Sequence, residues 1–380
     1  MRKALYAFSG DPITYGHIDV VSRTASAFDE VIVGIGVNPD KKYMFTLEER
    51  TEMAIKALNH LDNVKVMPVS GLLVDFAYEH KISVIVKGVR NSEDFNYENI
   101  LHQCGVTQKL GIDTFILIAR PELAHVSSSA VKSLQKEQGS IVGYVPLHVK
   151  QKLEEKMMEQ YIIGITGEPG SGKSYISEKF VELGKKAGIE VHNIELDLIG
   201  HEITNNLEEP VYKDVRAQIA KIFGKDVQRS DGSIDRKVLG EIVFNAPEKL
   251  EILDKIMFTP LMVRLRREIY GKKGLIVFNA ALIAETGISY ICNNNVILIN
   301  VNEQVKTERL TKRNLSDEQI KRRLSSQYSF DKKKETLENK IRENNNGKLW
   351  IYDNSDESND DKIEMLFNSI VKEQLIEKKI

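Results

Sequence analysis

A glycine-rich stretch between an apolar run and a helical pattern holds residues that are suited to phosphate chemistry. It reads Gly167-x-x-x-x-Gly172-Lys173-Ser174 and follows the apolar residues 161–165. Glycines let successive backbone N–H groups point at a polyphosphate, and the N-terminus of the next helix adds positive field. At this spacing Lys173 reaches the outer phosphates as a catalytic residue, and Ser174 holds Mg²⁺. The alternative is a loop that is rich in glycine by chance.

Three turns in the first half of the chain also place polar side chains directly after apolar runs. The first turn contains Ser9 and Gly10 and ends in the signature Thr14-Tyr15-Gly16-His17. His17 falls at the start of a predicted helix, where a donor binds a phosphate oxygen as negative charge builds. The alternative is a helix-capping turn with a passive histidine.

The second turn is Lys87-Gly88-Val89-Arg90, and the third is Val126-Ser127-Ser128-Ser129. Two cations on a glycine turn suit a polyphosphate, although a solvated basic turn is the simpler alternative. Hydroxyls and free backbone N–H groups at a helix start also accept phosphate. Ordinary helix capping would need only one of the three serines, so the run favours a phosphate site.

Two features of the second half point to phosphoryl transfer beside the glycine-rich loop. Asp197 ends a short apolar run, and there it could take a proton from a substrate hydroxyl or orient Mg²⁺. The alternative for Asp197 is a surface helix cap. Arg309 and Arg313 begin a basic helical region that could close over ATP as a lid, and a solvated basic face is the alternative.

The elements that must position these residues alternate between short apolar runs and amphipathic helical patterns. Predicted strands in the first half are residues 3–8, 31–37, 64–67, 84–86 and 114–118, and the first helices are 17–28 and 47–58. The second half repeats the alternation, with strands at 161–165, 190–194, 275–278, 296–301 and 348–353 and long helical patterns over 211–270. Such alternation predicts α/β domains with parallel sheets, whose ligands bind at the carboxyl ends of the strands.

Bulk properties describe an ordinary soluble protein of two or three domains. The chain has 380 residues, a formal net charge of -2 and 42% hydrophobic residues. The charge gives no basic field for nucleic acid. Cys104 and Cys292 lie far apart, which favours reduced thiols and a cytoplasmic location. The N-terminus turns polar too early for a secretory signal, and no apolar run is long enough to cross a membrane.

Together the three turns of the first half resemble bacterial phosphopantetheine adenylyltransferase, a nucleotidyltransferase with a T/H-x-G-H signature. The resemblance continues through residues 38–42, 44–50 and 94–98 and covers essentially all of residues 1–157. It implies a Rossmann-like domain that joins ATP and 4′-phosphopantetheine into dephospho-CoA and pyrophosphate. It implies no general base, since the attacking phosphate is already an anion, so catalysis rests on positioning and charge neutralisation with Mg²⁺.

The resemblance assigns roles by position. His17 and Lys41 are the catalytic residues. The phosphopantetheine substrate is assigned to Ser9, Lys41, Leu73 and Lys87. ATP is assigned to Ser9, Gly10, His17, Gly88, Val89, Arg90, Glu98, Leu123, Ala124, His125, Val126, Ser127, Ser128 and Ser129. A homo-oligomer formed through this domain is compatible with the resemblance.

This half departs from the family at two places. The family usually has Gly-Thr-Phe-Asp-Pro where this chain has Phe8-Ser9-Gly10-Asp11-Pro12. Gly10 thus stands in place of the family's phenylalanine, and the aromatic wall that this side chain would give to the site is absent at position 10. The family usually has arginine at Lys87, and lysine lacks the bidentate fork of arginine. We therefore expect weaker phosphopantetheine binding than in an arginine-containing relative.

The second half, residues 158–380, resembles dephospho-CoA kinase. The resemblance rests on the glycine-rich loop, the turn ending in Asp197, residues 231–239, and Arg309 with Arg313. It implies a P-loop kinase sheet with a helical lid, which phosphorylates the ribose 3′-hydroxyl of dephospho-CoA. Asp197 and Lys173 would be catalytic. ATP is assigned to Gly170, Ser171, Gly172, Lys173, Ser174, Tyr175 and Arg313.

The acceptor side of this half departs further from its family. Asp-Ala-Asp, His-Pro-Leu and Pro-Leu-Leu of the family are here Glu195-Leu196-Asp197, Thr259-Pro260-Leu261 and Ala281-Leu282-Ile283. Since the product of the first reaction is the acceptor of the second, the two resemblances together predict a bifunctional enzyme of coenzyme A synthesis. Direct transfer of dephospho-CoA between the two sites is an additional hypothesis. Two alternative functions remain open: another nucleotidyltransferase fused to another small-molecule kinase, and a catalytically degraded sensor of adenine nucleotides.

Overall fold

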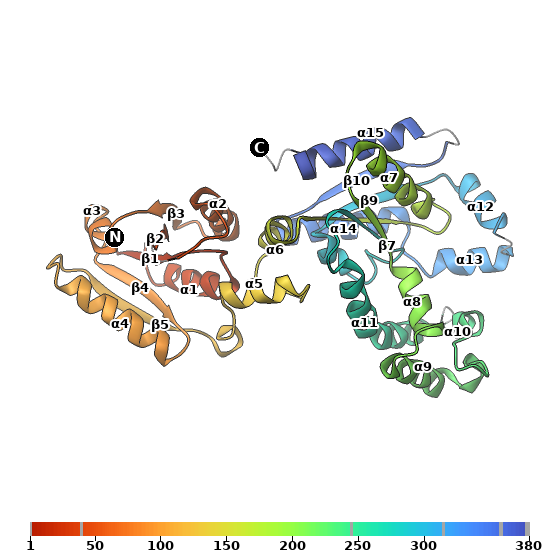
Figure 1. The fold of residues 1–380 in the computed structure, drawn as a ribbon, viewed down its shortest axis with the longest axis horizontal. Coiled ribbons are helices and arrows are strands. Elements are labelled where there is room, and N and C mark those ends of the chain that lie inside the picture. The colour runs from red at the N-terminus through yellow and green to blue at the C-terminus, as the bar shows by residue number, and fades with distance from the viewer. Residues whose placement is uncertain (1, 39–40, 244–245, 314–315, 357–359, 377–380) are drawn as a thin grey trace. The chain divides into compact units, whose positions relative to one another are not determined.

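The ten strands that the structure describes form two five-stranded sheets, and all pairings within both sheets are parallel. The structure is a computed structural model that describes residues 2–38, 41–243, 246–313, 316–356 and 360–376. The chain splits into two units, Met1–Met157 and Met158–Ile380, and each contains one sheet (Figure 1). Pro39 and Asp40, within the stretch 38–42 that carries part of the resemblance, lie outside the described residues.

The first sheet has the order β3-β2-β1-β4-β5, with β1 in its centre. Its strands are β1 Lys3–Phe8, β2 Glu30–Gly36, β3 Val64–Val69, β4 Val84–Val89 and β5 Asp113–Ile118. The central strands are apolar along nearly their whole length because both faces of a parallel sheet are covered. The chain reverses its direction of winding between β1 and β4, and ligands of open parallel sheets bind at such a point.

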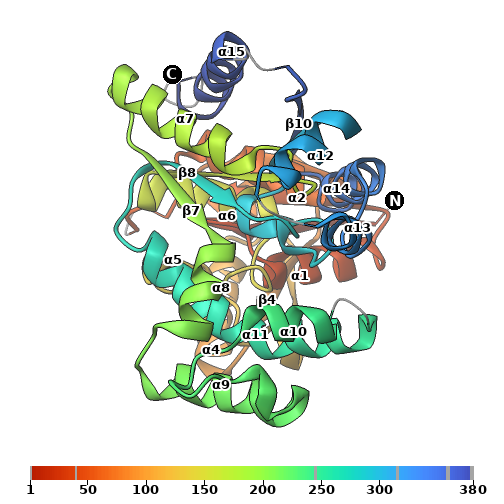
Figure 2. The same ribbon diagram turned by 90° about the vertical axis from the view of Figure 1, so that its right-hand side faces the viewer.

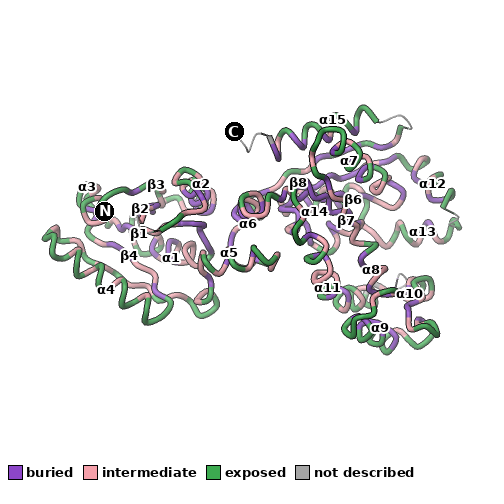
Figure 3. The backbone as a smooth tube through the Cα atoms, viewed as in Figure 1, coloured by how far each residue is buried: buried purple, intermediate pink, exposed green. Residues whose placement is uncertain are grey.

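Six helices of the first unit cover this sheet. They are α1 Tyr15–Ala25, α2 Leu47–Leu58, α3 Leu73–Glu79, α4 Ser92–Val106, α5 Ser128–Lys136 and α6 Leu147–Leu153. Val21 of α1, Ala54 of α2 and Val131 of α5 pack in one core, and Ala77 of α3 packs in a smaller one on Leu5 and Ile32. Helix α4 contains no buried residue (Figure 3).

The first helix begins and ends earlier than the sequence predicted. The expected range was 17–28, whereas α1 begins at Tyr15 and ends at Ala25. Thr14 has extended backbone angles and forms the N-cap, so helical geometry starts directly after it. His17 is consequently the third residue of the helix, inside its first turn.

The second sheet has the order β10-β9-β6-β8-β7, with β6 in its centre. Its strands are β6 Gln160–Gly167, β7 Val191–Glu195, β8 Gly274–Asn279, β9 Asn295–Asn300 and β10 Lys348–Asp353. Helices α7 Lys173–Ala187 and α15 Asp360–Val371 pack together on one face through Ile176, Phe180 and Phe367 (Figure 2).

The opposite face of this sheet carries most of the remaining helices. The pattern over 211–270 forms three helices, α9 Pro210–Phe223, α10 Arg236–Val243 and α11 Pro247–Ile269, which share a core with α8 Leu196–Asn205. The basic region forms α12 Glu303–Thr311 and α13 Asp317–Ser325, followed by α14 Phe330–Asn344. Among the described residues, no helix is both long and apolar enough to cross a bilayer.

Candidate active sites

A cavity of about 1000 Å³ opens at the carboxyl ends of the strands in the first unit. It brings together residues from the ends of β1 and β4, the turn before α5 and the loop after β2. Of the residues predicted to bind ATP or phosphopantetheine, it is lined by Ser9, Gly10, His17, Lys41, Leu73, Lys87, Gly88, Arg90, Glu98, Leu123, Val126, Ser127, Ser128 and Ser129. Val89, Ala124 and His125 are not among its lining residues. Val89 is buried in β4, and the ring of His125 packs edge-on against Tyr144.

His17 is held by the residue that caps its own helix. The Thr14 backbone N–H donates to His17 Nδ1 at 3.0 Å, and the Thr14 hydroxyl lies 2.9 Å from the same nitrogen. Burial and the nearby charge of Arg90 lower the pKa of His17 to about 4. The imidazole is therefore neutral at pH 7 and can act as a hydrogen-bond donor.

Asp11 ties the first turn to two other parts of the cavity wall. Its carboxylate accepts hydrogen bonds from the backbone N–H groups of Met44 and Phe45 and forms an ion pair with Lys132 of α5 at 2.8 Å. Burial works to raise the pKa of Asp11, but these hydrogen bonds hold it below its usual value. Sequence reasoning did not select Asp11 or Lys132, because 121 positions separate them.

Cations of the second turn are paired with carboxylates of α4. Lys87 meets Glu98 at 2.9 Å, and Arg90 meets Asp94 at 2.8 Å. Lys87 and Glu98 were assigned to different substrates, yet here they contact each other inside the cavity. A phosphate that approaches Lys87 must therefore share it with Glu98.

The three serines have different roles. Ser127 caps α5 by accepting from the Ala130 N–H at 3.1 Å, and Ser128 donates to the Pro12 carbonyl at 2.8 Å. Ser129 is exposed and lines the cavity. The run thus combines a cap, a tie to the first turn and one open hydroxyl at a helix N-terminus, where anions are favoured.

The second site lies at the turn between β6 and α7. Gly172 has a φ of +91°, and a Cβ at this position would collide with the amide of Asn354. Lys173 donates to the carbonyls of Gly167 and Glu168 at 3.0 and 3.3 Å, so its ammonium curls over the loop itself. The turn has the backbone shape that the glycine pattern predicted.

Lys173 is surrounded by charges from several elements. The pKa of Lys173 is lowered to about 8, mainly by burial. The charges of Lys333 and Arg313 contribute to this lowering, whereas Asp197 and Glu285 oppose it. These interactions bring the predicted catalytic residue Asp197 and the predicted lid residue Arg313 within electrostatic reach of the loop. A polyphosphate would compensate this excess of positive charge.

Three side chains from distant elements support the loop. Asn354, after β10, donates to the Ser171 carbonyl at 2.8 Å. Arg309 of α12 donates to the Asn354 carbonyl at 3.0 Å, and Lys306 pairs with Glu168 at 3.0 Å. The sequence singled out Arg309 as part of a lid, whereas here it also contacts the structure that holds the loop.

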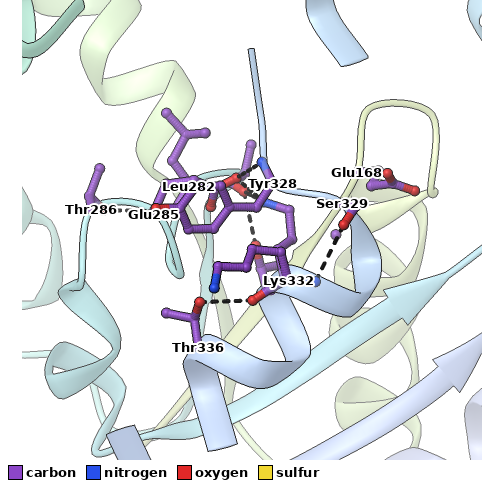
Figure 4. Close-up of polar contacts among 12 residues, drawn as sticks. Glu168, Leu282, Glu285, Thr286, Tyr328, Ser329, Lys332 and Thr336 are labelled. Carbon is purple, nitrogen blue, oxygen red and sulfur yellow. Dashed lines mark hydrogen bonds and ion pairs between the residues drawn. The ribbon is translucent and has the colours of Figure 1, made fainter. Parts of the chain in front are cut away.

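A buried ion pair next to this site was not predicted. Lys333 of α14 is fully buried, donates to the Ala281 carbonyl at 2.7 Å and meets Glu285 at 2.5 Å. Glu285 also accepts from the Tyr328 backbone N–H at 2.9 Å (Figure 4). Lys333 stands in a strongly charged helix, so nothing in its sequence context separates it from its exposed neighbours.

The donor set of the second site suits a metal ion that arrives with its nucleotide. Among the described residues, no group of three or more His, Cys, Asp or Glu could hold a metal. The Ser174 hydroxyl, at the start of α7, is an oxygen donor of the kind that Mg²⁺ accepts alongside phosphates and water. The residues present therefore fit Mg²⁺ bound mainly through a polyphosphate.

Comparisons with known proteins agree with the division into two units. Residues 9–134 match the cytidylyltransferase-like family model, and residues 161–349 match the dephospho-CoA kinase model. The chain is 38% identical over 168 residues to a phosphopantetheine adenylyltransferase of Clostridium perfringens. It is 42% identical over 161 residues to one of Clostridium kluyveri and 40% identical over 159 residues to one of Thermobifida fusca.

These three alignments cover 44%, 42% and 42% of this chain, but 99%, 98% and 96% of the respective relatives. Nearly the whole length of each adenylyltransferase is therefore matched by less than half of the chain, and the kinase model matches residues 161–349. The chain belongs to the phosphopantetheine adenylyltransferase family, and the same polypeptide carries a dephospho-CoA kinase domain.

Proposed function

We propose that the chain performs two consecutive reactions. Residues 1–157 transfer the adenylyl group of ATP to 4′-phosphopantetheine, giving dephospho-CoA and pyrophosphate. Residues 158–380 transfer the γ-phosphate of a second ATP to the ribose 3′-hydroxyl of dephospho-CoA. One observation carries the proposal: each half has its own strand-to-helix turn of a kind suited to phosphate, with His17 in one and Lys173 in the other.

In the first reaction a phosphate oxygen of phosphopantetheine attacks the α-phosphorus of ATP, and the bond to the pyrophosphate oxygen breaks. The nucleophile is an anion, so the site needs donors and cations rather than a base. His17 donates from Nε2 to the α-phosphate, and Lys41 neutralises the developing charge. Ser9 and Lys87 orient the attacking phosphate, while Arg90 and the N-terminus of α5 hold the nucleotide.

In the second reaction the ribose hydroxyl attacks the γ-phosphorus and ADP leaves. The backbone N–H groups at 170–175 cradle the phosphates, and Lys173 leaves the loop carbonyls to contact the β- and γ-phosphates. Asp197 accepts the hydroxyl proton. Arg313 closes from the lid and neutralises charge on the transferring group.

ATP-using families of these kinds generally need a divalent metal ion, and we propose Mg²⁺ for both sites. Ser174 would contribute one ligand in the second site, where bound Mg²⁺ neutralises phosphate charge. The substrates are small and anionic, and we propose neither a nucleic-acid nor a membrane partner. A cytoplasmic location, and a homo-oligomer formed through the first unit, are part of the same proposal.

The test is to incubate the purified chain with ATP, Mg²⁺ and 4′-phosphopantetheine and to follow pyrophosphate, ADP, dephospho-CoA and CoA by mass spectrometry. We expect all four products. His17→Ala should remove pyrophosphate and dephospho-CoA, whereas Lys173→Ala should stop the reaction at dephospho-CoA. Turnover of nicotinamide mononucleotide in place of phosphopantetheine would point to another nucleotidyltransferase, and ATP binding without turnover would point to a sensor.

A further inference from the structure

The aromatic ring of Phe8 lies flat against the imidazole of His17. The ring centroids are 4.4 Å apart and the planes differ by 13°. Phe8 is the last residue of β1, and both side chains line the cavity of the first unit. Behind Phe8 lies the ring of Tyr6, at 5.1 Å between centroids. The sheet therefore supports the histidine through a column of aromatic rings.

Gly10 leaves the space that this ring occupies. Its φ is +64°, and a Cβ at this position would lie 3.2 Å from Cε2 of Phe8. A larger side chain at position 10 would press on the ring that packs against His17. The sequence indicated that an aromatic wall is absent at Gly10. Phe8, two residues earlier, supplies an aromatic ring at this place.

The hydrogen bonds of His17 fix which nitrogen carries the proton. The Thr14 backbone N–H can only donate, so Nδ1 must be the acceptor. In a neutral imidazole the proton then sits on Nε2. Nε2 has no protein partner among the described residues, so its N–H is available to a ligand in the cavity.

Contacts to Nδ1 alone leave the ring free to tilt about them. A stacked aromatic face removes that freedom, because it sets the plane of the imidazole and hence the direction of the Nε2–H bond. We propose that Phe8 is a positioning residue for adenylyl transfer, which holds the neutral His17 ring so that Nε2–H meets the α-phosphate. This inference rests on the function proposed for the first unit.

The test compares Phe8→Leu, which removes the flat face, with Phe8→Tyr, which keeps it. We expect Phe8→Leu to lower the kcat of adenylyl transfer about tenfold, since an aromatic pair contributes on this scale. The KM for ATP should stay within about twofold, because the lost interaction acts on the transition state. Phe8→Tyr should restore kcat. Phe28→Leu is the matched control: Phe28 pairs with Phe115 and does not line the cavity.

A second readout does not need turnover. Nitrogen-15 NMR of histidine-labelled protein reports the tautomer of His17, which can be assigned with His17→Gln. We expect protonated Nε2 and unprotonated Nδ1 in all three proteins, because Thr14 sets the tautomer. The ring signals of His17 should be sharp in the wild type and in Phe8→Tyr, and broadened by motion of the ring in Phe8→Leu. If Phe8→Leu does not fold, Phe8→Met makes the same comparison.

A kcat for folded Phe8→Leu within about twofold of the wild type would overturn the proposal. So would a raised KM for ATP with unchanged kcat, since Phe8 would then be a wall for the nucleotide. If the wild type releases no pyrophosphate, the proposed function is wrong. The NMR experiment then remains the test of whether Phe8 positions the His17 ring. In that case His17 ring signals as sharp in Phe8→Leu as in the wild type would overturn the positioning role.

Discussion

The Lys87–Glu98 pair lies inside the first cavity, with side chains only 14% and 18% exposed. A lysine ammonium acts as a point charge, so its contact with Glu98 competes with an incoming phosphate. Arginine could hold Glu98 with one edge of its fork and keep another for the phosphate. We expect Lys87→Arg to lower the KM for 4′-phosphopantetheine roughly three- to tenfold.

The matched control is Lys65→Arg, which changes an exposed lysine that pairs with Glu30 outside the cavity. Steady-state kinetics of pyrophosphate release should show no effect of this control. A KM in Lys87→Arg that equals or exceeds the wild-type value would refute the idea that lysine weakens substrate binding here.

The pKa of Lys173 predicts how the kinase reaction responds to pH. Burial lowers this pKa from 10.5 to about 8 in the empty protein, whereas ATP requires the charged form. Above pH 8 the cation must be regained before ATP binds, so the KM for ATP should rise by up to about tenfold per pH unit. Initial rates with dephospho-CoA between pH 7 and 10 measure this. In Lys173→Arg, whose charge does not titrate in this range, the KM should stay flat.

The same shift has a consequence for stability. The unfolded chain keeps the Lys173 proton up to pH 10.5, while the folded chain loses it near pH 8. Between these values the unfolded state binds more protons, so this residue makes the folded state more stable as pH rises through the window.

For the kinetic prediction, a KM for ATP that is constant from pH 7 to 10 in the wild type would contradict the lowered pKa of Lys173.

The residues that sequence alone selects as catalytic candidates are those whose local pattern already favours the chemistry. His17 and Lys173 fall in turns whose glycines, hydroxyls and following helix all favour phosphate. The side chains that stack on them or act on them by charge come from other elements or have no distinctive type. Phe8 looks like an ordinary strand residue, and Lys333 like one of many exposed lysines, because their roles exist only after packing.

At the scale of elements, Lys333 joins α14 to the turn after β8. Its side chain is fully buried, and Glu285 is the carboxylate with which it forms an ion pair. Removing one member of such a pair leaves a buried, unpaired charge, which typically costs about 3–5 kcal/mol. We therefore expect Lys333→Met to lower the free energy of unfolding of the second unit by about 3 kcal/mol. Urea unfolding followed by the fluorescence of Trp350, the one tryptophan of the chain, reports on this unit.

The neighbouring residue provides a matched control. Lys332 pairs with Glu335 at 2.9 Å, but both side chains are more than half exposed. Exposed pairs contribute little, so Lys332→Met should change the same free energy by less than about 0.5 kcal/mol. Adding Glu285→Leu to Lys333→Met should recover part of the loss, because the unpaired carboxylate is gone. Equal losses in Lys332→Met and Lys333→Met would show that burial of the pair does not matter.

The alternation of elements was predictable because both sheets are covered on both faces and their central strands are nearly continuous apolar runs. Helix ends were less predictable, since α1 begins where Thr14 caps it rather than where the apolar pattern starts. The order of strands was not predicted either. It depends on contacts such as β6 with β8 and β9, which join segments more than a hundred residues apart.

At the scale of the molecule, each unit has its own sheet, its own cores and its own strand-to-helix turn that is predicted to bind phosphate. Independent cores predict that damage to one site leaves the other folded and active. The variants His17→Ala and Lys173→Ala should each remove one reaction, so neither alone should convert phosphopantetheine to CoA. Mixed together at equal concentrations, they should make CoA, because dephospho-CoA released by one chain can be phosphorylated by the other.

The rate of the mixture then shows whether dephospho-CoA leaves the protein between the two steps. Each variant contributes one working site. The mixture is therefore compared with wild-type protein at the concentration of one of the two variants, because both samples then contain the same number of working sites of each kind. With a freely diffusing intermediate, we expect equal steady-state rates of CoA formation, measured by mass spectrometry after any initial lag. A wild-type rate clearly above that of the mixture would instead indicate direct transfer, and an added kinase that competes for dephospho-CoA would then fail to intercept it. The control is each variant alone at the same total protein concentration. Neither should form CoA, which would exclude residual activity in the disabled site.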